Sequence, residues 1–204
     1  MNIKTENLGK RFNREWVFRN FNYQFEPGNI YTITGPNGSG KSTLLQVLWG
    51  QMQPSIGSVI YSSTSSLVKS MGEVFRSVAI AAPYMDLIDE FTLEEMIRFH
   101  FKFKKSRVPE EQVIEKTGLE STRQKLLSSF SSGMRQRLKL ALAFYSQTDL
   151  LFLDEPCTNL DKKSIQWYHD HLSQVPTDTL VFIASNQEIE YPATATKIDI
   201  ISFK

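Results

Sequence analysis

Short apolar runs alternate with amphipathic stretches along most of the chain. Leu150–Leu153 and Leu180–Ala184 contain no polar residue, which is the pattern of strands covered on both faces. Between them, Ser164–Leu172 has the spacing of a helix. Strands that alternate with helices predict a mainly parallel α/β sheet.

Further strands are predicted at both ends of the chain. Residues 1–34 have the pattern of strands separated by turns, and Asn20–Phe25 alternates polar and aromatic positions, as a half-buried strand does. Asn29–Thr34 is rich in β-branched and aromatic residues. Val78–Ala82 predicts a short apolar strand, and Lys197–Phe203 predicts the last strand of the sheet.

A polar, helical stretch separates two of these strands. Thr92 and Glu95 have the spacing of a capping box, and Pro109 suits the first turn of a second helix. Gly118 is placed to end that helix in a left-handed conformation. Residues 92–128 are therefore predicted to form a small helical insertion.

The segment between the strand at 29–34 and the next predicted helix fits the phosphate-loop pattern G-x-x-x-x-G-K-[ST]. Its candidate cofactor-binding residues are Gly35, Pro36, Asn37, Gly38, Ser39, Gly40, Lys41, Ser42 and Thr43. Glycines let successive N–H groups point at an anion, and the helix N-terminus adds positive potential. Lys41 can reach the β- and γ-phosphates, and Ser42 can bind Mg²⁺. A plain glycine-rich turn is the weaker alternative, so a nucleoside triphosphate is the leading ligand.

Two carboxylates follow the apolar strand at 150–153. In open α/β sheets, ligands gather beyond the carboxyl ends of the strands. Asp154 is a candidate Mg²⁺ ligand together with Ser42, and Glu155 is a candidate general base for the attacking water. A strand that ends in exposed acids is the alternative. Only the combination with the phosphate loop favours the catalytic interpretation.

A second anion-binding candidate lies in Phe130–Arg137, which opens a predicted helix. Ser131 and Gly133 are small residues in front of a helix N-terminus, which favours an anion. Taken alone, Ser131 is better explained as an ordinary N-cap.

The composition of the chain limits the kinds of partner and the cellular compartment that we expect for it. The net charge is +1, so there is no general attraction to nucleic acid or to an anionic membrane. Cys157 is the only cysteine, which fits a reducing cytoplasm. No signal peptide is expected, and no stretch approaches the roughly 18 apolar residues that cross a bilayer. A metal site at His169–His171 and single-strand binding by Phe99–Arg107 are both disfavoured.

Taken together, the motifs resemble those of the ATP-binding cassette (ABC) ATPase family over nearly the whole chain. Residues 35–43 resemble its Walker A motif, Leu150–Glu155 its Walker B motif with the catalytic glutamate, Phe130–Met134 its signature, and Thr158–Asp161 its D-loop. The resemblance implies an α/β P-loop NTPase fold with a mainly parallel core, an N-terminal antiparallel β region and a helical subdomain.

The domain boundaries follow from the same resemblance. We expect a single ABC ATPase domain over 1–204, with its core in 1–91 and 129–204 and its helical subdomain in 92–128. No room remains for a regulatory domain, which by analogy slightly favours export-type systems.

The resemblance also implies a working assembly. Two cassettes enclose two ATP molecules, each held by the phosphate loop of one subunit and by Ser131 and Gly133 of the other. Phe12 aligns with the aromatic residue that stacks on adenine, with Trp16 as a rival. We expect Mg²⁺-dependent ATP hydrolysis, a second ATPase subunit forming a homodimer, and a separate integral membrane permease. We expect the chain itself to be cytoplasmic, peripheral at the cytoplasmic face of the inner or plasma membrane. One alternative is a soluble ABC-type ATPase that is not coupled to transport but to nucleic acid, ribosomes or cofactor assembly. The other is a non-hydrolytic ATP-gated module.

Three positions depart from the family pattern. Tyr84 stands where the family usually has a glutamine near Mg²⁺ and the attacking water, and we expect it near the nucleotide. Asn186 stands where the family has a histidine, and it can bind a γ-phosphate but cannot become a cation. The signature over Ser131–Met134 reads S-S-G-M rather than the family's S-G-G-Q, which is a milder change. With Lys41, Glu155 and Asn186 as the candidate catalytic residues, we predict slow but real hydrolysis.

Overall fold

A computed structural model describes residues 1–63, 66–67 and 71–204. The chain forms two compact units. The first contains Met1–Val78, Thr148–Glu155 and Pro176–Lys204, and the second contains Ala79–Gln147 and Pro156–Val175. Each unit is therefore built from segments that are distant in the sequence.

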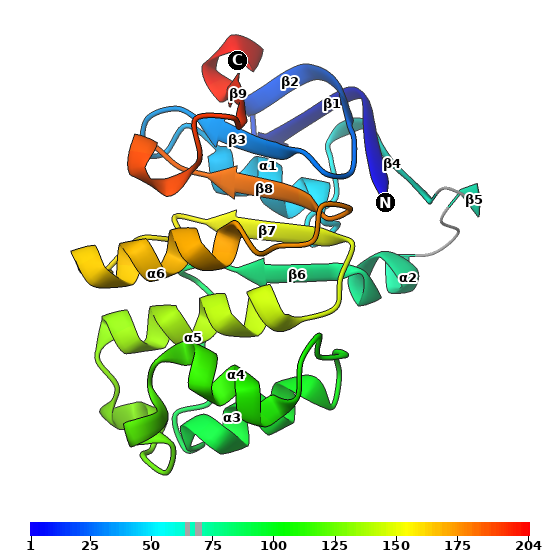
Figure 1. The fold of residues 1–204 in the computed structure, drawn as a ribbon. Helices are drawn as coiled ribbons and strands as arrows, with labels where there is room; N and C mark the ends of the chain where they lie inside the picture. Colours follow the sequence, from blue (N-terminus) through cyan, green and yellow to red (C-terminus); the bar gives the residue numbers. More distant parts are fainter. Residues whose placement is uncertain (64–65, 68–70) are drawn as a thin grey trace. The chain divides into compact units, whose positions relative to one another are not determined.

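An antiparallel sheet opens the first unit (Figure 1). Its strands are β1 (Asn2–Phe12), β2 (Glu15–Phe25), β4 (Ile56–Ser63) and β5 (Ser66–Leu67), in the order β2-β1-β4-β5. The hairpin between β1 and β2 turns over two residues, with Phe12 paired to Glu15. Asn13 in this turn has a φ of 54°, which asparagine tolerates better than most residues. The predicted strands before residue 35 are confirmed.

The first unit also holds parallel strands in the order β7-β8-β3-β9 (Figure 1). They are β3 (Ile30–Thr34), β7 (Leu150–Asp154), β8 (Leu180–Ala184) and β9 (Thr196–Asp199). Asp154 pairs with Ala184 in register, so β7 and β8 end side by side. The helical elements of this unit are α1 (Lys41–Leu48), α2 (Met71–Arg76), η3 (Glu188–Glu190) and η4 (Ile200–Phe203).

The predicted last strand is too long. The observed strand, β9, ends at Asp199, and Ile200–Phe203 forms a short 3₁₀ helix where the sequence predicted strand. The Asp199 side chain accepts a hydrogen bond from the Ile201 N–H at 3.0 Å, which stabilises the start of the turn.

Stacked aromatic side chains fix the strands that carry the candidate site. Phe152 of β7 and Phe182 of β8 are both fully buried, with ring centroids 4.8 Å apart and planes inclined by 4°. Trp49 packs edge-on against Phe152 at 5.3 Å, and Phe25 packs edge-on against Phe182 at 4.7 Å. Such pairs add about 0.5–1.5 kcal/mol each beyond area burial. The carboxyl ends of β7 and β8 are consequently held in one place.

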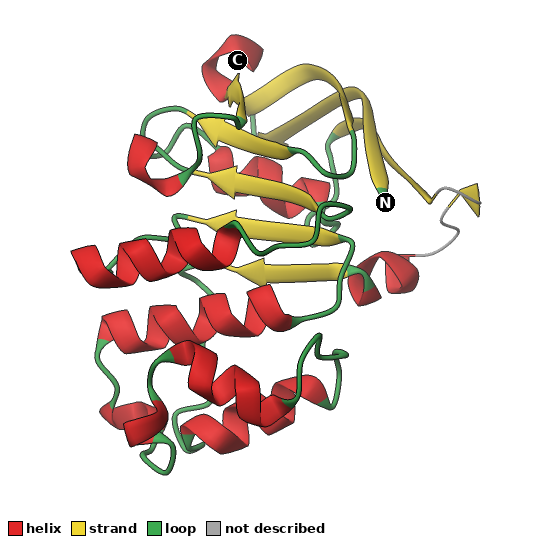
Figure 2. Ribbon diagram, viewed as in Figure 1, coloured by secondary structure: helices red, strands yellow, loops and turns green. Residues whose placement is uncertain are grey.

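The second unit is mainly helical (Figure 2). Its first strand is β6 (Val78–Ala81), of which Val78 still belongs to the first unit. The helical elements are α3 (Leu93–Phe101), α4 (Glu110–Thr117), η1 (Glu120–Thr122), η2 (Leu127–Ser129), α5 (Ser132–Tyr145) and α6 (Lys162–Leu172). The capping box of Thr92 and Glu95 and the left-handed C-cap at Gly118 are both confirmed.

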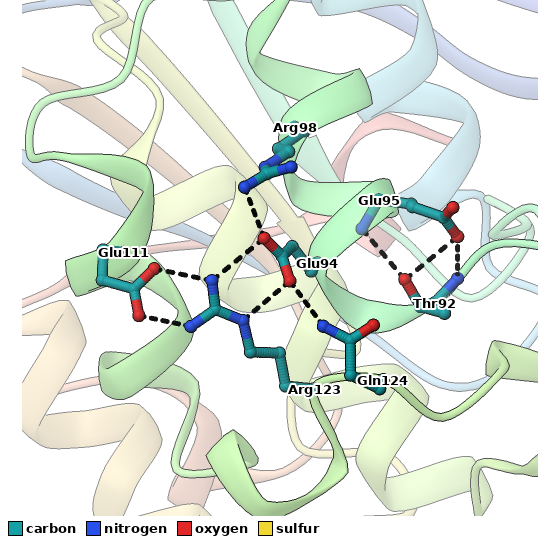
Figure 3. Close-up of polar contacts among 7 residues, drawn as sticks. All are labelled: Thr92, Glu94, Glu95, Arg98, Glu111, Arg123 and Gln124. Carbon is teal, nitrogen blue, oxygen red and sulfur yellow. Dashed lines mark hydrogen bonds and ion pairs between the residues drawn. The ribbon is translucent and has the colours of Figure 1, made fainter.

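A charged cluster joins α3, α4 and the segment after η1 (Figure 3). Arg123 donates to both oxygens of the buried Glu94 carboxylate, at 2.7 and 2.9 Å, and also pairs with Glu111 of α4. Gln124 and Arg98 complete the partners of Glu94. The hydrogen bonds from Arg123 are the main cause that lowers the pKa of Glu94 to about 2. A buried charge paired in this way keeps the three segments in register.

Candidate nucleotide-binding site

The phosphate loop lies between β3 and α1, in the first unit. Its turns are closed by backbone hydrogen bonds from the Ser39 N–H to the Pro36 carbonyl and from the Leu44 N–H to the Gly40 carbonyl. Gly40 precedes α1 with a φ of 106°, and a Cβ there would collide with Val17 of β2. A Cβ on Gly38 would meet no atom within 4 Å among the residues described. The loop is therefore packed against β2 on one side and open at Gly38.

Lys41 turns its side chain back into this loop. The residue is only 4% exposed, and its Nζ donates to the Gly35 carbonyl at 2.9 Å and to the Pro36 carbonyl at 3.2 Å. The buried Ser39 Oγ has no hydrogen-bond partner in the part of the chain that is described. Buried donors without a strong acceptor are what a polyphosphate would satisfy, so the loop fits this ligand.

Asp154 lies buried at the carboxyl end of β7, with 2% exposure. Ser42 donates a side-chain hydrogen bond to this carboxylate. Asp154 Oδ1 has no hydrogen-bond partner among residues 1–63, 66–67 and 71–204. Burial is the main cause that raises the Asp154 pKa to about 6; Glu155 raises it further, whereas Ser42 and Lys41 lower it. A hydroxyl and an unpartnered carboxylate oxygen are the donors that Mg²⁺ prefers, so the pair fits this ion.

Glu155 follows directly and has an unusual backbone. Its φ is 45°, a left-handed conformation that is uncommon for a residue with a Cβ. Its N–H donates to the Ala184 carbonyl of β8 at 2.9 Å, which fixes it at the end of the sheet. The half-buried Glu155 also acts electrostatically on Asp154, so the two carboxylates are neighbours.

Asn186 contacts the phosphate loop directly. Its Nδ2 donates to Asn37 Oδ1 at 2.8 Å. The structure thus brings the phosphate loop, Asp154, Glu155 and Asn186 together within the first unit.

The second unit contains a separate polar cavity of about 340 Å³ at the start of α5. It is lined by Leu119, Ser131, Ser132, Gly133, Met134, Arg137, Asn159, Asp161 and Ser164. Ser131 is the N-cap of α5, and its Oγ accepts from the Met134 N–H at 3.2 Å. A Cβ on Gly133 would lie 2.8 Å from the Asn159 carbonyl oxygen, so the helix approaches the loop before α6 too closely for a side chain.

Of the residues that line this cavity, only Ser131 and Gly133 were predicted site residues. Three of the others show how the cavity is built. Arg137, whose guanidinium lies 4.8 Å from the Trp167 ring, is four positions after Gly133 on α5, and this spacing on one helix face was the available signal. Asp161 caps α6 by accepting from the Ser164 N–H at 2.7 Å. Asn159 has a φ of 64°, which the sequence pattern does not reveal.

Comparison with known proteins identifies the family. A family model described as ABC transporter matches residues 18–158. The uncharacterized ABC transporter ATP-binding protein YybJ of Bacillus subtilis is 35% identical, over 84% of this chain and 79% of that protein. The chain belongs to the ABC transporter family. It is a nucleotide-binding domain of that family, as the resemblance of its motifs predicted.

Other relatives are longer than this chain. The bacitracin transport ATP-binding protein BcrA of Enterococcus faecalis is 30% identical over 98% of the chain, which spans 66% of BcrA. For the B. subtilis ABC transporter ATP-binding protein YdbJ, the chain spans 56% of the relative.

Solved ABC structures share the fold. An ABC transporter ATP-binding protein from Pyrococcus furiosus has a TM-score of 0.83 at 18% identity, covering 100% of this chain and 99% of its own. The bacterial ABC transporter cassette MJ0796 has a TM-score of 0.76 at 20% identity, covering 91% and 88%. The predicted fold class is confirmed. Within the ranges that the structure describes, every helix is too short or too polar to cross a membrane.

The aromatic candidates of this ABC domain lie at the β1–β2 hairpin. Phe12 is 48% exposed, with Lys10 Nζ 5.3 Å from its ring centroid. The Arg11 guanidinium lies 5.5 Å from the Trp16 ring. Val17 follows Trp16 and is the residue that a Cβ on Gly40 would strike, so this end of the hairpin approaches the phosphate loop.

Tyr84 belongs to the second unit, whereas the phosphate loop belongs to the first. It lies in a turn closed by the hydrogen bond from the Met85 N–H to the Ala82 carbonyl at 3.2 Å, and it is 43% exposed. Its expected place near the nucleotide remains a prediction.

Proposed function

We propose that this chain binds and hydrolyses Mg²⁺–ATP and thereby drives a separate membrane permease. The observation that carries the proposal is the buried Asp154 Oδ1, which has no hydrogen-bond partner among the described residues. It lies beside Ser42, which follows Lys41 of the phosphate loop. A buried carboxylate oxygen that accepts no hydrogen bond lowers stability unless a ligand uses it.

Each residue has a distinct task in the proposed reaction. Loop N–H groups and Lys41 hold the phosphates, and Ser42 with Asp154 would hold Mg²⁺, which supplies positive charge to the phosphate oxygens when bound. Glu155 orients the attacking water and takes its proton. Phe12 stacks on the adenine, and Tyr84 approaches the nucleotide.

The remaining half of the site comes from a second subunit, for which we propose a second copy of this chain. The cavity at the start of α5 presents Ser131 and Gly133 at a helix N-terminus, which suits the terminal phosphate of an ATP held by the partner. Loss of that phosphate on hydrolysis removes contacts across the interface and loosens the dimer.

We place this chain at the cytoplasmic face of the membrane, with the integral permease docked against its helical subdomain, which we assign to residues 92–128. A cavity of about 260 Å³ beside α3 is lined by Phe91, Glu95, Arg98, Phe99 and Lys102. The two aromatic rings suit an apolar segment, and Lys102 at the cavity suits an acidic residue on that segment. BcrA and the lantibiotic transport ATP-binding protein SrtF of Streptococcus pyogenes, 25% identical, are named for transport and support this proposal.

Nucleotide binding and turnover test the proposal directly. Lys41→Ala should weaken Mg²⁺–ATP binding by at least about tenfold, because a charge-assisted contact is lost. Glu155→Gln should keep binding and abolish turnover. Lys4→Ala, at an exposed ion pair with Glu6 in the same unit, is the matched control. Unchanged ATP affinity in Lys41→Ala would refute the proposed site, and unchanged turnover in Glu155→Gln would refute the role of Glu155.

Two further measurements separate the alternatives. Turnover in the parent protein excludes a non-hydrolytic ATP-gated module. Co-purification with a multi-span membrane protein favours the transporter subunit over a soluble ABC-type ATPase.

A further inference from the structure

The turn after β8 is braced by a buried polar pair. Ser185 is fully buried, and its hydroxyl donates to the carboxylate of Glu190, which is 1% exposed. The same Ser185 Oγ accepts from the Gln187 N–H at 2.8 Å, and the Glu190 N–H donates to the Gln187 carbonyl at 3.1 Å. The Ser185 N–H donates to the Ile33 carbonyl of β3 at 3.1 Å. Both ends of the turn are therefore fixed to the sheet or to each other.

Asn186 is the exposed residue that this braced turn presents to the phosphate loop. Its amide donates to Asn37 Oδ1, in the middle of the loop. Asn37 is followed by Gly38, which has a φ of 74° and open space around it. The contact thus links the most open part of the phosphate loop to a rigid support.

We propose that Asn186 is a positioning residue that orders the phosphate loop through Asn37 before a nucleotide arrives. The inference rests on the proposed nucleotide site and adds a role that does not involve the terminal phosphate. A glycine-rich loop loses conformational freedom when it closes on a ligand, and a pre-formed tether reduces that loss. Because the tether holds the loop rather than the γ-phosphate, it strengthens the binding of ATP and of ADP alike.

A double-mutant cycle with two nucleotides tests the inference. The affinities of Mg²⁺–ATP and Mg²⁺–ADP are measured by calorimetry for the parent, Asn186→Ala, Asn37→Ala and the double variant. Asn186→Ala should weaken both nucleotides by about fivefold, the equivalent of one net hydrogen bond. The double variant should be no weaker than Asn37→Ala alone, since both changes remove the same contact. Gln187→Ala, an exposed neighbour in the same turn, should leave both affinities unchanged.

A measurement without nucleotide keeps the inference separate from the proposed function. Amide hydrogen exchange across residues 35–40 should be faster in Asn186→Ala than in the parent. If the parent binds neither nucleotide, the proposed function is wrong, but the exchange rates still test whether Asn186 orders the phosphate loop. A loss of ATP affinity with unchanged ADP affinity, additive effects in the cycle, or equal exchange rates would each overturn the inference.

Discussion

Replacement of Asp154 by asparagine tests whether this carboxylate is kept for a ligand rather than for stability. Asparagine has nearly the same shape and retains an oxygen for the Ser42 hydroxyl, but it carries no charge. We expect Asp154→Asn to stabilise the nucleotide-free protein and to weaken the binding of Mg²⁺–nucleotide.

The size of the stabilisation follows from the pKa. Burial raises the pKa of Asp154 from 3.8 to about 6, so the folded protein holds this proton more tightly than the unfolded chain does. The folded protein is therefore most stable, with respect to this group, below pH 3.8, where the carboxyl is neutral in both states. This stability is lost as the pH rises through about 6 and the carboxyl ionises in the folded protein. At about 1.4 kcal/mol for each pKa unit, the ionised carboxylate costs about 3 kcal/mol at pH 7.5. This shift already includes the attraction to Lys41, so the expected gain for the uncharged Asp154→Asn is the same, about 3 kcal/mol.

Urea denaturation without nucleotide, at pH 7.5 and at pH 4, measures this gain. The stabilisation should be present at pH 7.5 and should shrink toward zero at pH 4, where the parent carboxyl is already neutral in the folded protein. With Mg²⁺–ATP at 100 times its Kd, the parent should gain about 2.7 kcal/mol and the variant much less.

Asp149→Asn is the matched control, because Asp149 is an exposed carboxylate immediately before the same strand. This control should change neither the free energy of unfolding without nucleotide nor the stabilisation by Mg²⁺–ATP. If Asp154→Asn were no more stable than the parent at pH 7.5, or if its advantage did not depend on pH, the assignment of Asp154 as a strained, ligand-ready carboxylate would be wrong.

Three further predictions concern other parts of the chain. Gly133→Ala should lower the free energy of unfolding by about 1–3 kcal/mol in thermal melts, because the new Cβ would lie 2.8 Å from the Asn159 carbonyl oxygen; the exposed Ser132→Ala is its control. Glu155→Asn should be more stable than Glu155→Gln by about 0.5–1 kcal/mol in urea, since both lose the carboxylate but asparagine tolerates a φ of 45°; equal stability would show that the backbone is not strained. Burial, with Lys104 nearby, lowers the pKa of His100 from 6.5 to about 4, so stability should be complete above pH 6.5 and fall by about 3 kcal/mol as the pH drops to 4; chemical denaturation across this range measures the loss, and His100→Gln should abolish it.

Local signals predicted much of the fold because they act within a few residues. The apolar runs of β7 and β8, the capping box at Thr92 and the glycine cap at Gly118 each depend on near neighbours. The last strand was overextended because Ile200 and Ile201 have strand-like side chains, whereas the Asp199 carboxylate bonds the Ile201 N–H and starts a turn.

The parts of the site that escaped prediction depend on contacts between distant segments. The motifs located the phosphate loop and the acids of β7, but the amide contact from Asn186 to Asn37 joins residues 149 positions apart. Arg137 enters the cavity at Ser131 because α5 places it one turn after Gly133, and its ring partner Trp167 comes from α6. The buried Glu94 has a local partner in Arg98 of the same helix, but Arg123 and Gln124 reach it only when the segment after η1 returns to α3.

The backbone conformation of Glu155 bears on both the stability of the fold and the proposed reaction. Glu155 is the last residue of its segment of the first unit, and Pro156 begins a segment of the second. A left-handed residue with a Cβ costs about 1–2 kcal/mol, and glycine or asparagine would avoid most of that cost. The Asp154–Ala184 register and the hydrogen bond from the Glu155 N–H to the Ala184 carbonyl hold the residue in this conformation. Glu155 is a strained position that carries neither glycine nor asparagine, and it follows a buried carboxylate whose Oδ1 has no hydrogen-bond partner in the described part of the chain. A required acidic side chain explains this better than folding does. The same strand register that imposes the strain also fixes the backbone position from which the Glu155 side chain extends. A general base needs such a fixed position.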